Sequence, residues 1–230
     1  MNKILNITDT QLLVKEGYNP HLYMNEFINN EYYKKLLNEF PNDDLFTEEQ
    51  PKTRKLGQRP HCRRFMCITT EKESPYFDDY IINQTKLPMI WQEILTEIKG
   101  EEYRKWICDM LQIKDFRIRF DFHRTESGLD VSPHVDSVGK YASHLLYFMP
   151  EEWNDDNGGS TIFYSGKTID KLNPEPTDFK QSVLYPVIGN SSLLFKNVPD
   201  GWHGITEVKA NNMSRQLCNV VILKNETNNI

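Results

Sequence analysis

Residues 116–123 read FRIRFDFH, and this stretch decides the fold. Its apolar and polar residues alternate, so an extended chain would bury one face and turn the other toward polar groups. The polar face carries Arg117, Arg119, Asp121 and His123. Upstream of Ile113 the apolar residues recur at helical spacing instead. The change of period from 3.6 to 2 predicts that a β-rich part of the chain begins here.

Short apolar or alternating runs continue downstream, separated by clusters of Gly, Asn, Asp and Pro. They predict strands over 142–149, 160–165, 181–188, 191–196, 203–208 and 215–223. Upstream, helical spacing predicts helices over 23–40, 88–99 and 101–111. Many short strands after a helical block favour the α+β class with a mainly β core, as a sandwich or barrel flanked by helices. We expect one domain over 1–230, helix-rich over 1–113 and β over 114–224.

The composition limits the classes of function. With 230 residues and 38% hydrophobic content, the chain can bury one sizeable core. A formal charge of −6 gives no reason to expect a nucleic acid partner. There is no run of 18 apolar residues and no convincing signal peptide, so we expect no membrane contact and a cytoplasmic protein. The four cysteines, at 62, 67, 108 and 218, fit no zinc or redox spacing.

Positive charge gathers at one place, in the stretch 52–64. It carries Lys52, Arg54, Lys55, Arg59, Arg63 and Arg64. Such a run is more typical of a solvated loop than of a binding site. A contact with an anionic substrate is a hypothesis that this stretch leaves open.

The motif His134-Val135-Asp136 supplies an imidazole and a carboxylate at positions of equal parity, so both side chains point to one face of a strand. His203 follows Asp136 by 67 residues. Two His and one carboxylate form the facial triad that holds non-haem Fe(II) and leaves coordination positions open. His123 and His144 compete with His203 for the third position, because both lie on predicted strands beside the motif. A surface His next to an unrelated Asp is the simplest alternative.

Arg215 opens the last predicted strand, 12 residues after His203. Its guanidinium is charged at any physiological pH and can grip a carboxylate with two parallel hydrogen bonds. The alternative is an exposed Arg with a surface partner.

The segment from Arg119 to Trp153, RFDFHRTESGLDVSPHVDSVGKYASHLLYFMPEEW, continues with NDDNGGSTIFY, SSLLFKN, GWHGITEV and SRQLCNVVIL. This order of motifs resembles the Fe(II)/2-oxoglutarate-dependent oxygenases, of the prolyl-4-hydroxylase-like and phytanoyl-CoA-hydroxylase-like kind. The matching motifs are His134-Val135-Asp136, Gly158-Gly159, Trp202-His203-Gly204-Ile205 and the basic residue on the strand that follows. The resemblance covers residues 115–224.

The resemblance implies a double-stranded β-helix, a jelly-roll of the cupin-like kind, with helices from the N-terminal half packed on one sheet. It implies that His134, Asp136 and His203 bind Fe(II) and that Arg215 binds the far carboxylate of 2-oxoglutarate. The implied reaction uses O₂ to hydroxylate an unactivated C–H bond and releases succinate and CO₂. Related halogenases lack a carboxylate at the position of Asp136, so halogenation is disfavoured.

One departure concerns the far carboxylate of the co-substrate. Members of the family often place Ser or Thr two residues after the basic residue, whereas this chain has Leu217. The candidates for a second partner of that carboxylate are Tyr147, His123 and Arg119. Two further residues, Lys140 and Ser143, could face the substrate.

The sequence leaves two classes of substrate, a peptidyl or free amino acid and a small metabolite. It does not predict the oligomeric state. Two other classes of function also remain. A cupin-like metal enzyme that does not use 2-oxoglutarate would not need Arg215. A non-catalytic β-barrel binding protein would need none of the metal ligands, and the intact triad argues against it.

Overall fold

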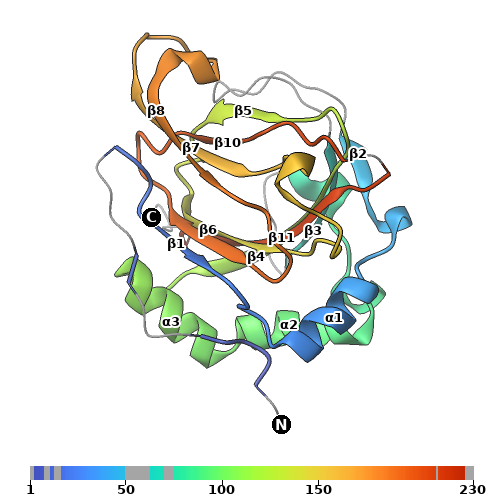
Figure 1. Cartoon of the computed structure of the whole chain (residues 1–230). Helices are drawn as coiled ribbons and strands as arrows, with labels where there is room; N and C mark the ends of the chain where they lie inside the picture. Colours follow the sequence, from blue (N-terminus) through green and yellow to red (C-terminus); the bar gives the residue numbers. More distant parts are fainter. Residues whose placement is uncertain are drawn as a thin grey trace.

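Two antiparallel sheets face each other, and three α-helices cover the outer side of the larger one (Figure 1). The computed structural model describes residues 3–7, 11–12, 17–49, 63–69, 75–210 and 212–225. The mostly β architecture with helices on one sheet agrees with the predicted class. Among the described residues, no helix combines the length and the apolarity that spanning a bilayer requires.

The larger sheet has seven strands in the order β1-β9-β6-β11-β4-β3-β2. Their bounds are β1 His21–Met24, β2 Thr47–Glu49, β3 Arg63–Ile68, β4 Arg117–Thr125, β6 Lys140–Tyr147, β9 Ser192–Lys196 and β11 Arg215–Leu223. The smaller sheet has the order β5-β10-β7-β8. Its strands are β5 Val131–His134, β7 Thr161–Lys167, β8 Phe179–Tyr185 and β10 His203–Ile205. Each of the strands predicted downstream of Ile113 therefore exists, with ends shifted by a few residues.

The helices are α1 Asn30–Asn38, α2 Met89–Lys99 and α3 Glu101–Leu111. Short 3-10 turns occupy Asp43–Leu45, Pro75–Tyr80, Gln84–Lys86, Asp155–Asn157 and Pro176–Asp178. The second and third helices match the predicted ranges.

The helix predicted over 23–40 is wrong in its first part. Residues from His21 to Met24 form β1 and pair with β9 instead. The helix begins only at Asn30, where the side chain of Asn29 accepts a hydrogen bond from the backbone N–H of Glu31 at 3.0 Å. The larger sheet thus draws β1, β2 and β3 from the part of the chain expected to be helix-rich.

Alternation along β4 and β11 divides the larger sheet into two faces. On the outer face, Phe120, Phe122, Val220 and Ile222 are fully buried against the helices. Trp91 of α2 packs its ring against Phe122 and donates its indole N–H to the carbonyl of Leu36 at 3.1 Å. Each large side chain buried in this way stabilises the fold by about 1.5–3 kcal/mol. The apolar faces of the strands therefore hold the helices, as the alternation in FRIRFDFH predicts.

The inner face of the same sheet looks toward the smaller sheet and carries the polar residues. Arg119 and Asp121 of β4 are buried there, and so are Asn219 of β11 and Ser143 of β6. The registers place Arg119 opposite Val221 and Val221 opposite Ser143. Polar side chains from three neighbouring strands thus gather between the two sheets.

Most of the basic stretch 52–64 lies outside the described residues. Of its charged side chains the structure describes Arg64, whose guanidinium pairs with the carboxylate of Asp43 at 3.0 Å. Arg64 therefore has a structural partner within the fold, and the hypothesis of an anionic substrate at this stretch stays a hypothesis.

His144 should make stability depend on pH. It is fully buried beneath the helices, where its Nδ1 lies 2.8 Å from the hydroxyl of Tyr103, and burial lowers its pKa to about 3. The unfolded chain takes up this proton near pH 6.5, so it binds more protons than the folded chain between about pH 6.5 and 3. As the pH is lowered through this window, we expect the free energy of unfolding to decrease by up to about 1.4 kcal/mol per pH unit from this one group.

Urea unfolding between pH 4 and 7, with chelator present, checks this expectation through the slope of free energy against pH. The slope should become shallower in His144→Phe. It should stay unchanged in Tyr103→Phe, which removes the hydrogen bond but keeps the buried imidazole. Equal slopes in wild type and His144→Phe would show that His144 does not contribute.

Candidate metal centre

The pairing of β10 with β5 brings the two predicted histidine ligands together. His203 is the register partner of His134, and their ring centroids lie 4.4 Å apart. Asp136 follows two residues after the end of β5, so its carboxylate reaches the same place. One ligand atom from each of His134, Asp136 and His203 lies within 4.8 Å of the others. A single metal ion could therefore contact all three.

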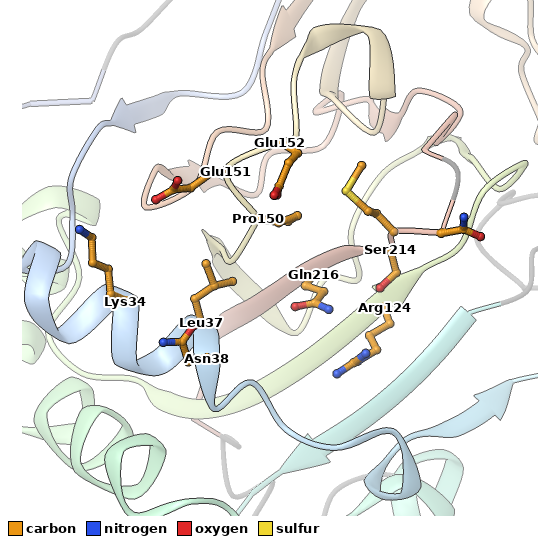
Figure 2. A pocket seen from close by; sticks show the side chains of 11 residues that line it. Lys34, Leu37, Asn38, Arg124, Pro150, Glu151, Glu152, Ser214 and Gln216 are labelled. Carbon is orange, nitrogen blue, oxygen red and sulfur yellow. The ribbon is translucent and has the colours of Figure 1, made fainter.

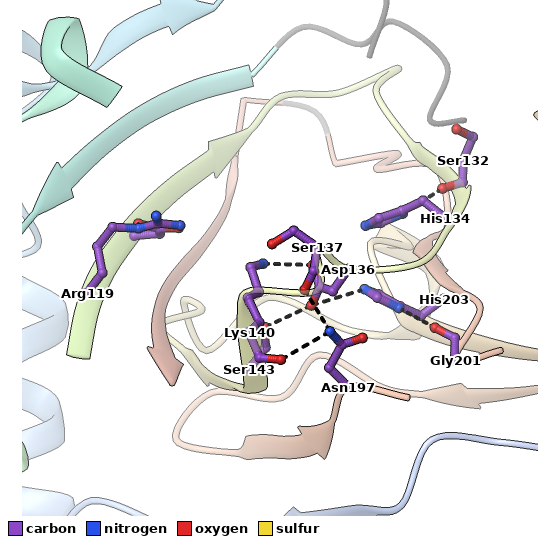
Figure 3. A network of polar contacts seen from close by, with 11 residues as sticks. Arg119, Ser132, His134, Asp136, Ser137, Lys140, Ser143, Asn197, Gly201 and His203 are labelled. Carbon is purple, nitrogen blue, oxygen red and sulfur yellow. Dashed lines mark hydrogen bonds and ion pairs between the residues drawn. The ribbon is translucent and has the colours of Figure 1, made fainter. Parts of the chain in front are cut away.

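Both imidazoles are held in the tautomer that leaves Nε2 unprotonated. His134 Nδ1 lies 2.9 Å from the carbonyl of Ser132, and His203 Nδ1 lies 2.9 Å from the carbonyl of Gly201 (Figure 3). A carbonyl oxygen can only accept, so each Nδ1 carries the proton and donates it. Each Nε2 is left with its lone pair available for coordination.

The protonation states also suit a cation. Burial lowers the pKa of His134 to about 3, helped by the neighbouring His203, and burial likewise lowers the pKa of His203. Burial alone would raise the pKa of Asp136, but Lys140 and the two imidazoles outweigh it and hold that pKa below its usual range. At neutral pH the cluster offers two neutral nitrogen donors and one carboxylate, which is the donor set of a facial triad.

The two oxygens of Asp136 have different neighbours. Oδ2 lies 3.9 Å from His203 Nε2 and accepts a hydrogen bond from Ser143 Oγ at 3.2 Å. Oδ1 accepts from the ammonium group of Lys140 at 2.7 Å. Lys140 and Ser143, which the sequence left as residues that could face the substrate, both contact the predicted metal ligand Asp136 (Figure 3).

Arg215 is fully buried in the same space between the sheets. Its Nε donates to the carbonyl of Gly159 at 2.7 Å, and its Nη2 donates to Thr161 Oγ1 at 3.3 Å. Its Nη1 is buried without a hydrogen-bond partner among the described residues. A desolvated guanidinium with an open donor indicates an anionic ligand, because leaving such a group unpaired is costly.

Of the three candidates for a second partner of the far carboxylate, Tyr147 lies beside Arg215. The guanidinium carbon of Arg215 is 5.3 Å from the centroid of the Tyr147 ring, and the Tyr147 hydroxyl is 2.8 Å from Thr161 Oγ1. Thr161 was missed from the sequence. Its position two residues after the glycine pair, at the first residue of β7, is the signal that could have found it.

The structure places Arg119 away from Arg215 along the sheet. Its register partner on β11 is Val221, six residues from Arg215, or roughly 20 Å along the strand. Arg119 instead forms two hydrogen bonds with Asp121, from Nε at 2.7 Å and from Nη2 at 2.9 Å.

The histidines that competed with His203 take other places. His123 lies on the inner face opposite Leu217, and its ring centroid is 5.0 Å from that of Phe65. His144 points to the outer face, where its ring packs against Phe27 and Tyr103. His144 is therefore on the wrong side of β6 to reach Asp136.

Asn219 was also missed from the sequence. It interrupts the apolar run LCNVVIL at a position of the same parity as Arg215, which is the signal it offers. Its side chain is buried, and Oδ1 has no hydrogen-bond partner among the described residues. Buried amides normally satisfy both polar atoms, so Asn219 adds a second open polar group to the inner face.

A pocket of about 660 Å³ lies outside this space (Figure 2). Its lining includes Lys34 of α1, Arg124, and Ser214 and Gln216, which flank Arg215 on the chain. Since side chains alternate along β11, Gln216 faces away from the side on which Arg215 lies. This pocket is therefore separate from the metal cluster.

No family model matches this sequence, and no curated protein matches it. Solved structures do match. A prolyl-4-hydroxylase from Pseudomonas putida is 12% identical, with 90% of this chain and 94% of that chain covered and a TM-score of 0.59. SnoK, a non-haem alpha-ketoglutarate-dependent carbocyclase from nogalamycin biosynthesis, is 10% identical, with 92% and 84% covered and a TM-score of 0.58.

A prolyl hydroxylase from Trichoplax adhaerens, in complex with a peptide fragment of the hypoxia inducible factor oxygen degradation domain, is 14% identical, with 89% and 84% covered and a TM-score of 0.56. At these identities the similarity establishes the fold.

The buried ion pair of Arg119 and Asp121 should be essential for stability. Asp121→Asn would leave the guanidinium buried without its carboxylate, so we expect a loss of about 3–5 kcal/mol in the free energy of unfolding. Asp109→Asn breaks the exposed pair of Asp109 with Lys105 and should cost less than about 0.5 kcal/mol. Urea unfolding of both variants measures the difference, and similar losses would contradict the expectation.

Proposed function

We propose that this chain, which has the fold of the Fe(II)/2-oxoglutarate oxygenases, is itself an Fe(II)- and 2-oxoglutarate-dependent dioxygenase that hydroxylates an unactivated C–H bond. The observation that carries the proposal is the pairing of two features in one space between the sheets. A His-Asp-His cluster lies there, and so does a buried Arg215 with an open donor. A metal enzyme without an acidic co-substrate would not need the second feature.

The donor set supports Fe(II) as the metal. His134, Asp136 and His203 would hold it through two imidazole nitrogens and a carboxylate oxygen. Three protein ligands leave positions for other groups, which distinguishes this set from the closed four-ligand sites of structural zinc. The carbonyls of Ser132 and Gly201 keep both rings oriented.

The surroundings of Arg215 support 2-oxoglutarate. A dicarboxylate could place one end at the metal and the other at Arg215 Nη1, with the hydroxyls of Tyr147 and Thr161 close by. When bound, Fe(II), 2-oxoglutarate and O₂ supply oxidative decarboxylation to succinate and CO₂, with insertion of one oxygen atom into a C–H bond. The chain contributes a fully buried guanidinium whose position the carbonyl of Gly159 and the hydroxyl of Thr161 fix.

For the primary substrate we propose a peptidyl or free amino acid, or a small metabolite. One similar structure holds a peptide fragment, which supports the first class. Another is named a carbocyclase, so the same fold serves a different outcome on a different substrate. The substrate-facing residues must therefore be identified by a substrate screen.

The test is an anaerobic titration of metal-free protein with Fe(II) and then 2-oxoglutarate, followed by the visible metal-to-ligand charge-transfer band. We expect the band in wild type and a loss of at least about 30-fold in 2-oxoglutarate affinity in Arg215→Ala, because a buried charged pair is worth 2–5 kcal/mol. His203→Ala should lose the metal itself. Wild-type protein that binds Fe(II) without forming the band would contradict the use of 2-oxoglutarate.

Gly159→Ala should weaken the binding of 2-oxoglutarate without abolishing the binding of the metal. Gly159 has φ of +71°, and an added Cβ would lie 2.9 Å from Arg215 Cδ, so the guanidinium must move. We expect roughly tenfold weaker 2-oxoglutarate binding, since a small misplacement of a binding group costs at least that much. Gly128→Ala is the matched control, because Gly128 has φ of +81° with nothing within 4 Å. Equal effects of the two substitutions would mean that backbone strain, and not Arg215, is responsible.

A further inference from the structure

Lys140 stands out because it contacts the oxygen of Asp136 other than the one that lies near His203. Its ammonium lies 2.7 Å from Asp136 Oδ1, while Oδ2 is the oxygen near His203. The two side chains are 16% and 10% exposed, so this is a largely buried ion pair inside the site. Lys140 therefore divides the carboxylate into one oxygen held by an ammonium and one that is turned toward the metal cluster (Figure 3).

We propose that Lys140 is a positioning residue that keeps Oδ1 of Asp136 occupied, so that Oδ2 alone can bind the metal. The inference rests on the proposed function. A carboxylate can bind a cation through one or both oxygens. A second oxygen on the metal would take a position that the keto acid end of 2-oxoglutarate needs. Holding Oδ1 away would thus keep the coordination sphere open for the co-substrate.

The backbone around Lys140 is fixed firmly enough for this role. The N–H of Lys140 donates to the carbonyl of Ser137 at 3.1 Å, which closes a turn between Asp136 and β6. Asn197, at the end of β9, donates its side-chain N–H groups to the carbonyls of Ser137 at 2.8 Å and of Lys140 at 3.2 Å. The N–H of Lys224 donates to the carbonyl of Gly139 at 2.8 Å. Two other segments thus pin the turn that carries the ammonium.

The positive charge of Lys140 has a second consequence. An ammonium beside Asp136 repels a divalent cation bound to the same carboxylate. Lys140 therefore opposes metal binding while it favours co-substrate binding. A residue that merely stabilised the site would favour both metal binding and co-substrate binding. The effects of Lys140 on the two affinities have opposite signs, so measuring both affinities distinguishes the two roles.

The experiment measures Co(II) affinity and then 2-oxoglutarate affinity of the Co(II)-loaded protein, in wild type and in Lys140→Met. We expect Co(II) affinity to be retained or increased and 2-oxoglutarate affinity to fall about tenfold, which corresponds to about 1.4 kcal/mol. The Co(II) absorption spectrum without co-substrate should change, because a second oxygen joins the metal. Lys140→Arg keeps a cation at Oδ1 and should restore wild-type behaviour.

Lys105→Met is the matched control. It removes an ion pair with Asp109 that has the same spacing along the chain, but on the exposed surface of α3. It should change neither affinity. Asn197→Ala loosens the turn without altering a charge, so it should lower the affinity for 2-oxoglutarate, as Lys140→Met does. It provides a second test if Lys140→Met folds poorly.

The outcomes separate the proposals. Tighter Co(II) with unchanged 2-oxoglutarate would make Lys140 only a competitor of the metal and would overturn its positioning role. Loss of both affinities would make it a support of the ligand set, which also overturns that role. Wild-type protein that binds Co(II) but not 2-oxoglutarate would overturn the proposed function and this inference together.

Discussion

The antiparallel pairing of β10 with β5 is the constraint on which the site depends. It places His203 opposite His134, although the two residues are far apart in the sequence. On its other side β10 pairs with β7, where His203 stands opposite Phe163. Because β10 has only three residues, its pairing with β5 on one side and β7 on the other fixes where His203 lies. Backbone carbonyls then orient each ring, so the site depends on main-chain geometry more than on flexible side chains.

The alternation of the larger sheet is equally strict. Ser143 and His144 are neighbours on β6, yet Ser143 contacts Asp136 on the inner face while His144 lies among aromatic rings on the outer face. A slip of one residue in register would exchange them, putting a polar hydroxyl under the helices and an imidazole beside the metal cluster. The apolar outer face thus does more than stabilise the fold. By fixing the register, it decides which side chains reach the space between the sheets.

The sequence alone predicts features that depend on the pattern within one strand or on the residue types that a metal needs. The alternation of FRIRFDFH identifies β4 and its polar face, and the small set of residue types that bind Fe(II) narrows the ligands to a few histidines. Prediction from the sequence fails where a strand forms by pairing with a segment far away in the chain. The strand β1 pairs with β9, and nothing within residues 23–40 distinguishes that short strand from the start of a helix. Sequence analysis also does not identify the nearest partner of a side chain, since Arg119 forms an ion pair with Asp121 two residues away.

The balance of charges between the sheets favours one order of binding for the metal and the co-substrate. Between the sheets, Arg119 is neutralised by Asp121 and Lys140 by Asp136, whereas Arg215 has no carboxylate among the described residues. The five charged groups therefore leave one positive charge, which lies at the Arg215 end. A divalent cation at the other end would make the space positive at both ends, which suits a dianion that spans them. In the proposed enzyme the metal should therefore precede the co-substrate, because 2-oxoglutarate gains its second electrostatic contact only once the cation is present.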